Sequence, residues 1–109
     1  MPEHPHLTDL EQLLLLALLR LGGDAHGHAI QEDILETASR SVPLGSVHVT
    51  LGRLEERGLA RSRKGRPRGR RGGKARRLYT TTSRGREALE WNRRAFERMW
   101  EGVLAEGET

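Results

Sequence analysis

Apolar residues recur with a helical period along the first part of the chain. Leucine dominates the stretch LEQLLLLALLRL at 10–21, which precedes a Gly-Gly pair. Its Glu11 lies three residues after Thr8, at capping-box spacing. This pattern predicts a helix over about residues 8–21. Because leucines point in almost every direction around this helix, we expect one side to pack on its own domain. Another side should meet a second apolar surface, such as a partner chain.

Two further amphipathic helices follow, with a short turn between them. AHGHAIQEDILETASR places its apolar residues on one stripe and its acidic residues opposite, and it should end near Ser39. SVPLGSVHVTLGRLEERGL repeats apolar residues at helical spacing and ends at Gly58, which suits a left-handed cap. Three helices in this order have the form of a helix-turn-helix.

The helical spacing of apolar residues ends after Gly58, and extended segments follow. LARSRK and KARRLYTT contain strand-forming residues and flank RPRGRRGG, in which one Pro and three Gly mark a loop. We therefore predict a two-stranded hairpin over roughly 59–65 and 74–81. Thr82 is placed to cap a final helix that runs to about Leu104.

These elements predict a mainly α-helical fold with a small β-hairpin. Residues 1–82 would form a winged helix-turn-helix, and residues 83–109 a C-terminal dimerisation helix, both within one compact unit. A chain of 109 residues is long enough to form one hydrophobic core of three or four helices. It is too short to form two independent cores.

Positive charge is concentrated in the predicted hairpin. RSRKGRPRGRRGGKARR, at 61–77, holds ten Arg or Lys and no acidic residue, whereas the formal net charge of the chain is +4, so the other 92 residues carry −6. An acidic body with one cationic element points to a polyanionic partner. Strand-forming residues at both ends of the stretch favour a folded wing over a disordered tail.

Other classes of function find little support. The chain has no Cys, which excludes disulfides, thiolate metal sites and thiol nucleophiles. It has no phosphate-binding Gly loop, nucleophile elbow or paired-carboxylate stretch, so we expect neither an enzyme nor a cofactor. The longest apolar run, LLLLALL, is far below the ~20 residues that span a bilayer. The N-terminus also lacks a cationic secretory start, and we expect a cytoplasmic protein without membrane contact.

A metal site is a weaker alternative. Asp24, His26 and His28 have a short spacing, and His48 could complete a ligand set. The pattern D-x-H-x-H at a helix start is a common accident, however, so we interpret these residues as helix-start contacts and predict no metal site. Whether His26 and His28 bind metal stays open at this stage.

The third helix is the one that would enter the major groove of DNA. Its outer face is small, and its polar side chains can donate to phosphates or base edges, while wing arginines suit phosphates or the minor groove. The predicted contacts to double-stranded DNA are Ser46, His48, Val49, Thr50 and Arg53 on the helix and Arg66, Arg68, Arg70, Arg71 and Lys74 on the hairpin. The alternatives are an RNA-binding module acting through the Arg/Gly-rich hairpin and a winged helix that binds only protein.

Aromatic residues recur along the last predicted helix. Phe96 and Trp100 share its apolar stripe, while Trp91 falls on nearly the opposite side. Such residues are more often core or dimer contacts than ligand contacts. The predicted dimer interface or effector pocket comprises Leu14, Leu18, Trp91, Phe96 and Trp100.

Several motifs resemble the PadR family of bacterial transcriptional regulators. They are LLLLALL, AHGHAI, PLGSVHVTLGRLEERGL and GGKARRLYTTTSRGREAL, which together cover about residues 8–100 in the right order. The resemblance implies a homodimeric winged-helix repressor in which the C-terminal helix crosses onto the partner's first helix. It also implies a small aromatic effector, because some small members bind flat aromatic or cationic compounds.

The chain departs from the family pattern at four positions. His28 and His48 stand where a Tyr is usual, Val49 stands where Pro is common, and Thr81 stands where a Leu is usual. The resemblance still implies DNA contact at Ser46, His48 and Thr50.

Overall fold

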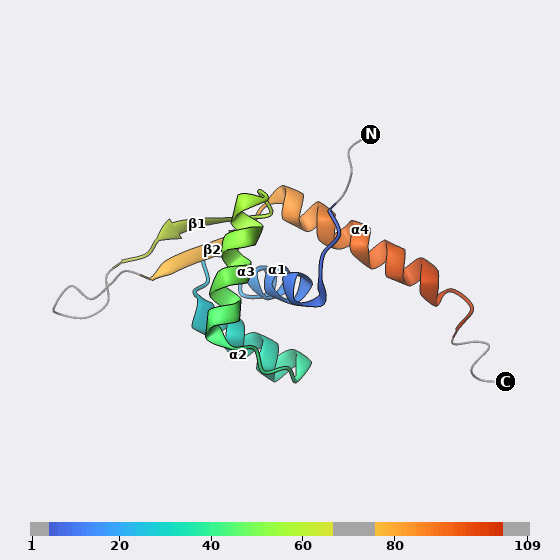
Figure 1. Ribbon diagram of the computed structural model, residues 1–109, viewed down its shortest axis with the longest axis horizontal. Helices are drawn as coiled ribbons and strands as arrows, with labels where there is room; N and C mark the ends of the chain where they lie inside the picture. Colours follow the sequence, from blue (N-terminus) through green and yellow to red (C-terminus); the bar gives the residue numbers. More distant parts are fainter. Residues whose placement is uncertain (1–4, 67–75, 104–109) are drawn as a thin grey trace.

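The computed structural model describes residues 5–66 and 76–103 (Figure 1). Within these residues the chain forms four helices and one antiparallel hairpin. The helices are α1 (Asp9–Arg20), α2 (Gly27–Ala38), α3 (Leu44–Glu56) and α4 (Ser83–Trp100), and the strands are β1 (Ala60–Lys64) and β2 (Arg77–Thr81). The prediction of a mainly helical fold with one small hairpin is confirmed, and the elements occur in the predicted order.

Side-chain caps fix the starts of two helices as predicted. At α1, Glu11 N donates to Thr8 Oγ1 at 3.2 Å while Thr8 N donates to Glu11 Oε1 at 2.8 Å, which completes a capping box. At α4, Gly85 N donates to Thr82 Oγ1 at 3.1 Å. These bonds satisfy backbone donors that a helix start leaves without an intrahelical partner.

The last helix is shorter than the apolar spacing predicted. We expected it to reach about Leu104, whereas α4 ends at Trp100. Gly102 follows with a φ of +79°, a left-handed conformation that ends a right-handed helix. Leu104 itself lies outside the described residues.

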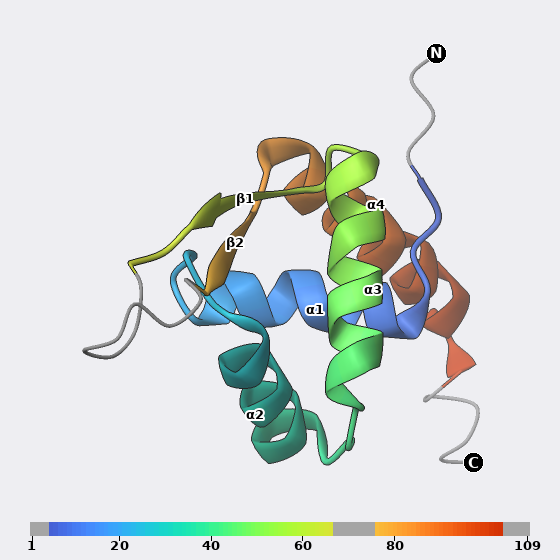
Figure 2. The same cartoon turned by 60° about the vertical axis from the view of Figure 1, so that its left-hand side comes forward.

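The core lies where α3 crosses α1, with α2 packed beside both (Figure 2). A cluster of aliphatic side chains fills this crossing and is removed from water. Burying each of these side chains contributes on the order of 2 kcal/mol to folding. The largest fully buried members are Leu14, Leu15, Leu18, Ile30, Val47, Leu51, Leu54 and Leu59.

The base of the hairpin is joined to the helices by backbone and side-chain bonds. Ala25 N donates to Tyr79 O at 3.0 Å and Tyr79 N donates to Ala25 O at 2.8 Å, so the turn after α1 pairs with β2. Thr81 Oγ1 donates to Leu15 O at 2.9 Å, which satisfies a hydroxyl that is only 9% exposed. The hairpin and α4 then project toward opposite ends of the domain (Figure 1).

The N-terminal segment is held against α4 by Asn92, a residue that the sequence analysis did not single out. Asn92 Oδ1 accepts from Leu7 N at 3.2 Å, and Nδ2 donates to Pro5 O at 3.1 Å and to Ala88 O at 2.7 Å. The amide is 5% exposed, and these bonds satisfy it. An Asn one turn after Ala88, on the apolar side of the helix, was the sequence signal for such a buried contact.

Candidate nucleic-acid interface

The exposed face of α3 carries small and uncharged side chains toward its N-terminal end, and its charged side chains, Arg53, Glu55 and Glu56, lie toward its C-terminal end. Ser46 is half-buried on it, and His48 and Arg53 are exposed. Val49 has 56% of its surface exposed, which is high for a branched aliphatic residue. These four predicted contacts therefore share one accessible face of the helix.

Thr50 is placed differently from the prediction. It is only 9% exposed, because it lies three residues after Val47 and four before Leu54, both of which are fully buried. Thr50 was predicted to be one of the DNA contacts of this helix. In the structure its side chain belongs to the buried side of α3 and not to the exposed face.

His48 packs against the first turn of α2. A Cβ placed on Gly27 would lie 2.9 Å from His48 Cε1, so the missing side chain at Gly27 makes room for the imidazole. His48 nevertheless remains exposed at the surface of α3. The ring is thus oriented by the fold and still accessible to a partner.

The register of the hairpin separates its side chains onto two faces. Ser62 lies opposite Tyr79 and Lys64 lies opposite Arg77, and both pairs share one face because side chains alternate along a strand. Ser62 Oγ donates to Glu55 Oε2 of α3 at 2.6 Å, which identifies this face as the α3 side. Lys64 and Arg77 therefore extend the surface of α3 along the hairpin.

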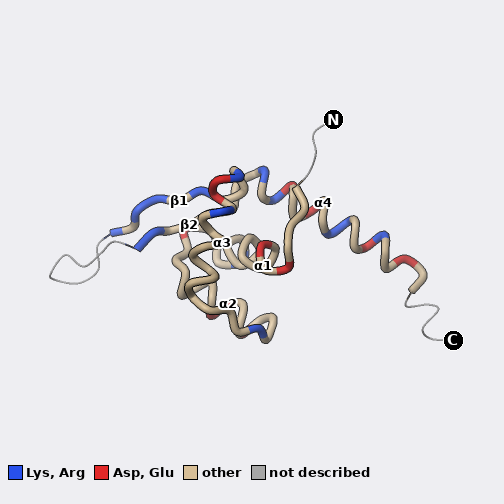
Figure 3. Tube along the Cα trace, in the orientation of Figure 1, with Lys and Arg blue, Asp and Glu red and all other residues tan. Residues whose placement is uncertain are grey.

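Lys64 and Arg77 form a like-charge pair at directly opposed positions. Such a pair destabilises an isolated hairpin. Among the described residues, no carboxylate forms an ion pair with either side chain. Figure 3 shows Lys and Arg along β1 and at the start of β2. An anionic partner that neutralises this surface would remove the repulsion.

The other face of the hairpin is tied to the turn after α1. The Asp24 carboxylate accepts two hydrogen bonds from Arg63, each of 3.1 Å, and Asp24 N donates to Thr80 Oγ1 at 3.0 Å. Hydrogen bonding to Arg63 holds the pKa of the Asp24 carboxyl below its ordinary value. Arg63 is therefore oriented and partly neutralised by the protein, unlike Lys64 and Arg77.

One of the five predicted hairpin contacts lies within the described residues. Arg66 is exposed beside the end of β1. The other four, Arg68, Arg70, Arg71 and Lys74, lie outside the described residues. Their predicted roles depend on the sequence alone.

The two histidines of the possible metal site lie in different surroundings. His26 caps α2, because Ala29 N donates to His26 Nδ1 at 3.2 Å, and its Nε2 lies 2.7 Å from Arg76 Nη1. His28 is exposed on α2. Over residues 5–66 and 76–103, no three His, Asp or Glu side chains are grouped so that they could hold a metal ion.

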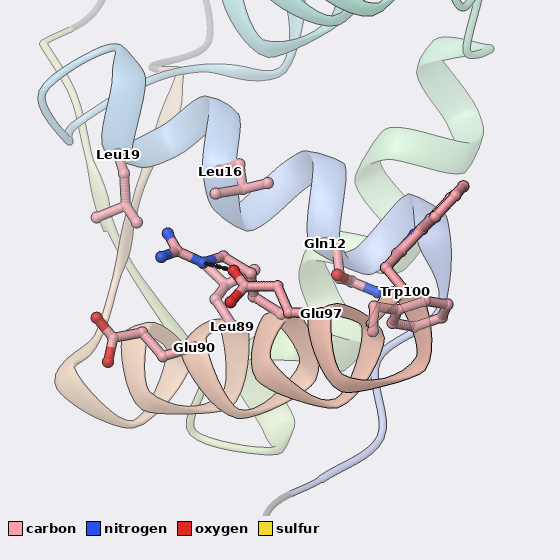
Figure 4. A pocket seen from close by; sticks show the side chains of 9 residues that line it. Gln12, Leu16, Leu19, Leu89, Glu90, Glu97 and Trp100 are labelled. Atoms are coloured by element: carbon pink, nitrogen blue, oxygen red, sulfur yellow. Dashed lines mark hydrogen bonds and ion pairs between the residues drawn. The ribbon is translucent and has the colours of Figure 1, made fainter. Parts of the chain in front are cut away.

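A groove between α1 and α4 is a second candidate site (Figure 4). It encloses about 400 Å³, and Leu16 and Leu19 of α1 face Leu89 and Trp100 of α4 across it. Arg93 Nε donates to Glu97 Oε1 at 2.7 Å within it. The full lining is Gln12, Leu16, Leu19, Leu89, Glu90, Arg93, Phe96, Glu97 and Trp100.

Two of the five residues predicted for this surface do line the groove. Phe96 and Trp100 are 60% and 56% exposed there. Leu14 and Leu18 are instead fully buried in the core, and Leu16, with 44% exposed, takes the accessible position on α1. An all-leucine pattern does not reveal which leucines face inward, which explains this correction.

Trp91 also lies away from the groove. Its ring meets the His6 ring edge to face, with centroids 5.4 Å apart and planes at 71°. This contact lies on the side of α4 that meets the N-terminal segment. The prediction that Trp91 points nearly opposite to the Phe96 stripe is consistent with this position.

Residues 15–91 match the family model described as the transcriptional regulator PadR-like family. The match covers more than half of the 109 residues. The chain belongs to the PadR-like family. PadR-like proteins are DNA-binding transcriptional regulators and not enzymes, in agreement with the sequence prediction. No curated protein matches the chain.

Solved structures share the fold of this PadR-like chain. A PadR family regulator from Eggerthella lenta DSM 2243 is 26% identical with a TM-score of 0.69, over 93% of this chain and 88% of that one. Bacillus subtilis PadR in complex with operator DNA is 24% identical with a TM-score of 0.65, over 76% of this chain and 46% of that one.

The fold prediction is confirmed by a further neighbour, F93 from STIV, a winged-helix DNA-binding protein. It is 13% identical with a TM-score of 0.68, over 90% of this chain and 98% of that one. The PadR-like chain therefore has a winged-helix fold. None of its described helices combines the length and the apolar character needed to cross a membrane.

Proposed function

We propose that this PadR-like regulator is a ligand-responsive homodimeric repressor that acts in the cytoplasm on a specific sequence of double-stranded DNA. In this proposal α3 enters the major groove, and Ser46, His48, Val49 and Arg53 contact base edges and phosphates. The exposure of these four side chains on one face of α3 supports the assignment. The fold similarity to a PadR bound to operator DNA is consistent with it.

One observation carries the role of the hairpin in this proposal. Lys64 and Arg77 lie opposite each other on the face that adjoins α3, without a carboxylate partner among the described residues. DNA phosphates would neutralise both cations while α3 occupies the groove. We extend this role to Arg66 and to the hairpin residues Arg68, Arg70, Arg71 and Lys74.

We propose that residues 1–82 bind DNA and that residues 83–109 form a dimer with a second copy. Leu16, Phe96 and Trp100 expose apolar surface around the α1–α4 groove, and apolar surface gathered in one place marks an interaction site. A two-fold dimer would present two α3 helices to successive major grooves, about 34 Å apart, and would select a pseudopalindromic site.

The same groove is our candidate for an effector site. Its volume of about 400 Å³ and its Phe96 and Trp100 side chains suit a small aromatic molecule. Titration with planar drugs and phenolic acids should change Trp fluorescence and operator affinity together. Unchanged fluorescence and affinity across the panel would remove the effector from the proposal.

The DNA-binding mode is tested by titrating the protein against its own upstream DNA, unrelated duplex DNA and structured RNA at several matched salt concentrations. We expect retention on the upstream duplex at moderate salt and a loss of that preference in Ser46→Ala and His48→Ala variants. Preference for RNA without dependence on Ser46 or His48 would instead support the RNA-binding alternative.

A further inference from the structure

The exposed face of α3 contains two glycines that the fold does not require. Gly45 and Gly52 are seven residues apart, so they lie two turns apart on the same side of the helix. A Cβ built on either glycine would meet nothing within 4 Å, and neither residue has a positive φ. Glycine destabilises a helix interior relative to alanine, so its presence at Gly52 has no explanation within the chain.

Val49 lies between these two glycines on the same side of α3. It follows Gly45 by one turn and precedes Gly52 by three residues, so its side chain projects between two positions that have no side chain. More than half of Val49 is exposed, at 56%, although a branched aliphatic group gains free energy when it leaves water. On this face the apolar side chain of Val49 therefore stands between two positions, Gly45 and Gly52, that have no side chain.

We propose that Val49 contacts the 5-methyl group of a thymine in the major groove, and that Gly45 and Gly52 let the backbone of α3 approach the base edges closely enough for this contact. The thymine methyl is the apolar group on the major-groove edge of an A·T pair, and valine offers no hydrogen bond with which to select any other base. This inference deepens the proposed function and rests on α3 entering the major groove.

The chemistry of the contact also separates DNA from RNA. Uracil has the same hydrogen-bonding edge as thymine but lacks the methyl group, so Val49 would favour a thymine-containing duplex. The neighbouring Ser46, His48 and Arg53 side chains donate hydrogen bonds and can read other positions. Each half-site is therefore expected to contain one A·T pair whose thymine methyl matters, at a fixed distance from the centre of the site.

The first test selects duplexes from a random DNA pool with the full-length protein and then replaces each thymidine of a selected duplex with deoxyuridine, one at a time. The wild-type protein should lose about fourfold in affinity at one thymine in each half-site. Val49→Ala should bind the unmodified duplex about fourfold more weakly and show no further loss at that position. Leu35→Ala, which trims a 52% exposed side chain on α2, is the matched control and should retain the deoxyuridine effect.

The second test uses Gly52→Ala. Because the added methyl group meets nothing in the free protein, Tm should rise by about 2–5 °C. Affinity for the selected duplex should fall at least fivefold, because the methyl group would enter the space occupied by DNA. A rise in Tm with unchanged affinity would overturn the close approach of α3.

Different results would contradict sequence-specific DNA binding and the contact between Val49 and thymine. If no duplex is enriched from the pool, the proposed sequence-specific function is wrong. If a duplex is enriched but no deoxyuridine position depends on Val49, the function stands and the thymine contact is overturned.

Discussion

The exposed face of α3 and the hairpin adjoin each other, yet their chemistry differs. The helix face carries one cation, Arg53, and two carboxylates, Glu55 and Glu56, beside small, polar and apolar side chains, whereas the described hairpin carries Lys and Arg along β1 and Arg77 at the start of β2 (Figure 3). Contacts to phosphates supply affinity without sequence information, and contacts to base edges supply sequence information. The difference between the two regions therefore suggests a division between general affinity and sequence choice.

The largest effect should follow from neutralising Lys64, Arg66 and Arg77 together with glutamine. If each contacts a phosphate, the slope of log affinity against log salt should fall by nearly three units, and affinity at 0.1 M salt should fall by roughly 10²-fold. The loss should be equal for the selected duplex and for a scrambled one. Salt-dependent titrations with both duplexes measure it.

A matched control separates this effect from net charge. Arg84→Gln, Arg86→Gln and Arg98→Gln remove the same charge from exposed positions on α4. This variant should bind DNA within a few fold of the wild type and keep the wild-type salt slope. Equal losses in the two variants would show that the location of the hairpin cations does not matter.

A smaller effect with the opposite signature should follow from Ser46→Ala combined with His48→Ala. Neither change removes a permanent cation, so the salt slope should stay nearly constant. The ratio of affinities for selected and scrambled duplexes should fall about tenfold, because each misread base pair costs about 1–3 kcal/mol. Competition titrations at one salt concentration give this ratio. If the ratio is preserved here but changes in the hairpin variant, the two roles are reversed.

Features that depend only on residues close together in the sequence could be predicted from it. The Thr8 and Thr82 caps, the hairpin and the fold class follow from spacing and turn composition alone. The inward turn of Thr50 and the burial of Leu14 could not be predicted in the same way. They depend on which side of each helix meets the others, and the leucine-rich pattern of α1 has no polar face that would mark the answer.

The contacts that hold the hairpin to the rest of the domain were also invisible in the sequence. Asp24 and Arg63 are 39 residues apart, and nothing in a charge pattern shows that they meet. Ser62 and Glu55 are close in sequence, but they contact each other only because the chain reverses after α3. Such contacts arise from the packing of the hairpin on the rest of the domain, and the Ser62–Glu55 bond determines how far the helix face and the hairpin act independently.

Asp24→Asn should sharpen the comparison by making the hairpin more cationic. The change releases Arg63, so DNA affinity should rise, by at most about eightfold at 0.1 M salt, with the salt slope steeper by no more than about one unit. Asp9→Asn removes the same charge from the start of α1 and should leave the slope unchanged. A fall in affinity for Asp24→Asn would mean that the ion pair orients the hairpin rather than neutralises it.

The same pair predicts a pH dependence. Because pairing with Arg63 lowers the pKa of Asp24 in the folded protein, the stabilisation is fully present above the ordinary carboxyl pKa and is lost as the pH falls through the lowered value. At neutral pH the pair is therefore intact. The Tm of the wild type and the Tm of Asp24→Asn, each measured by thermal unfolding at a series of acidic pH values, should become equal at low pH.

The smallest effect should come from Ser62→Ala, which tests whether the two regions act as one surface. The variant loses the 2.6 Å hydrogen bond from Ser62 Oγ to Glu55 Oε2, while the Glu55 carboxylate stays hydrated at the surface. The free energy of unfolding should fall by about 0.5–1 kcal/mol. Affinity should fall about threefold for selected and scrambled duplexes alike, because α3 and the hairpin no longer hold a fixed spacing. Ser83→Ala removes a hydroxyl from an exposed position on α4 and should change neither quantity. An unchanged affinity in Ser62→Ala would mean that the helix and the hairpin engage DNA independently, in which case their contributions to binding should simply add.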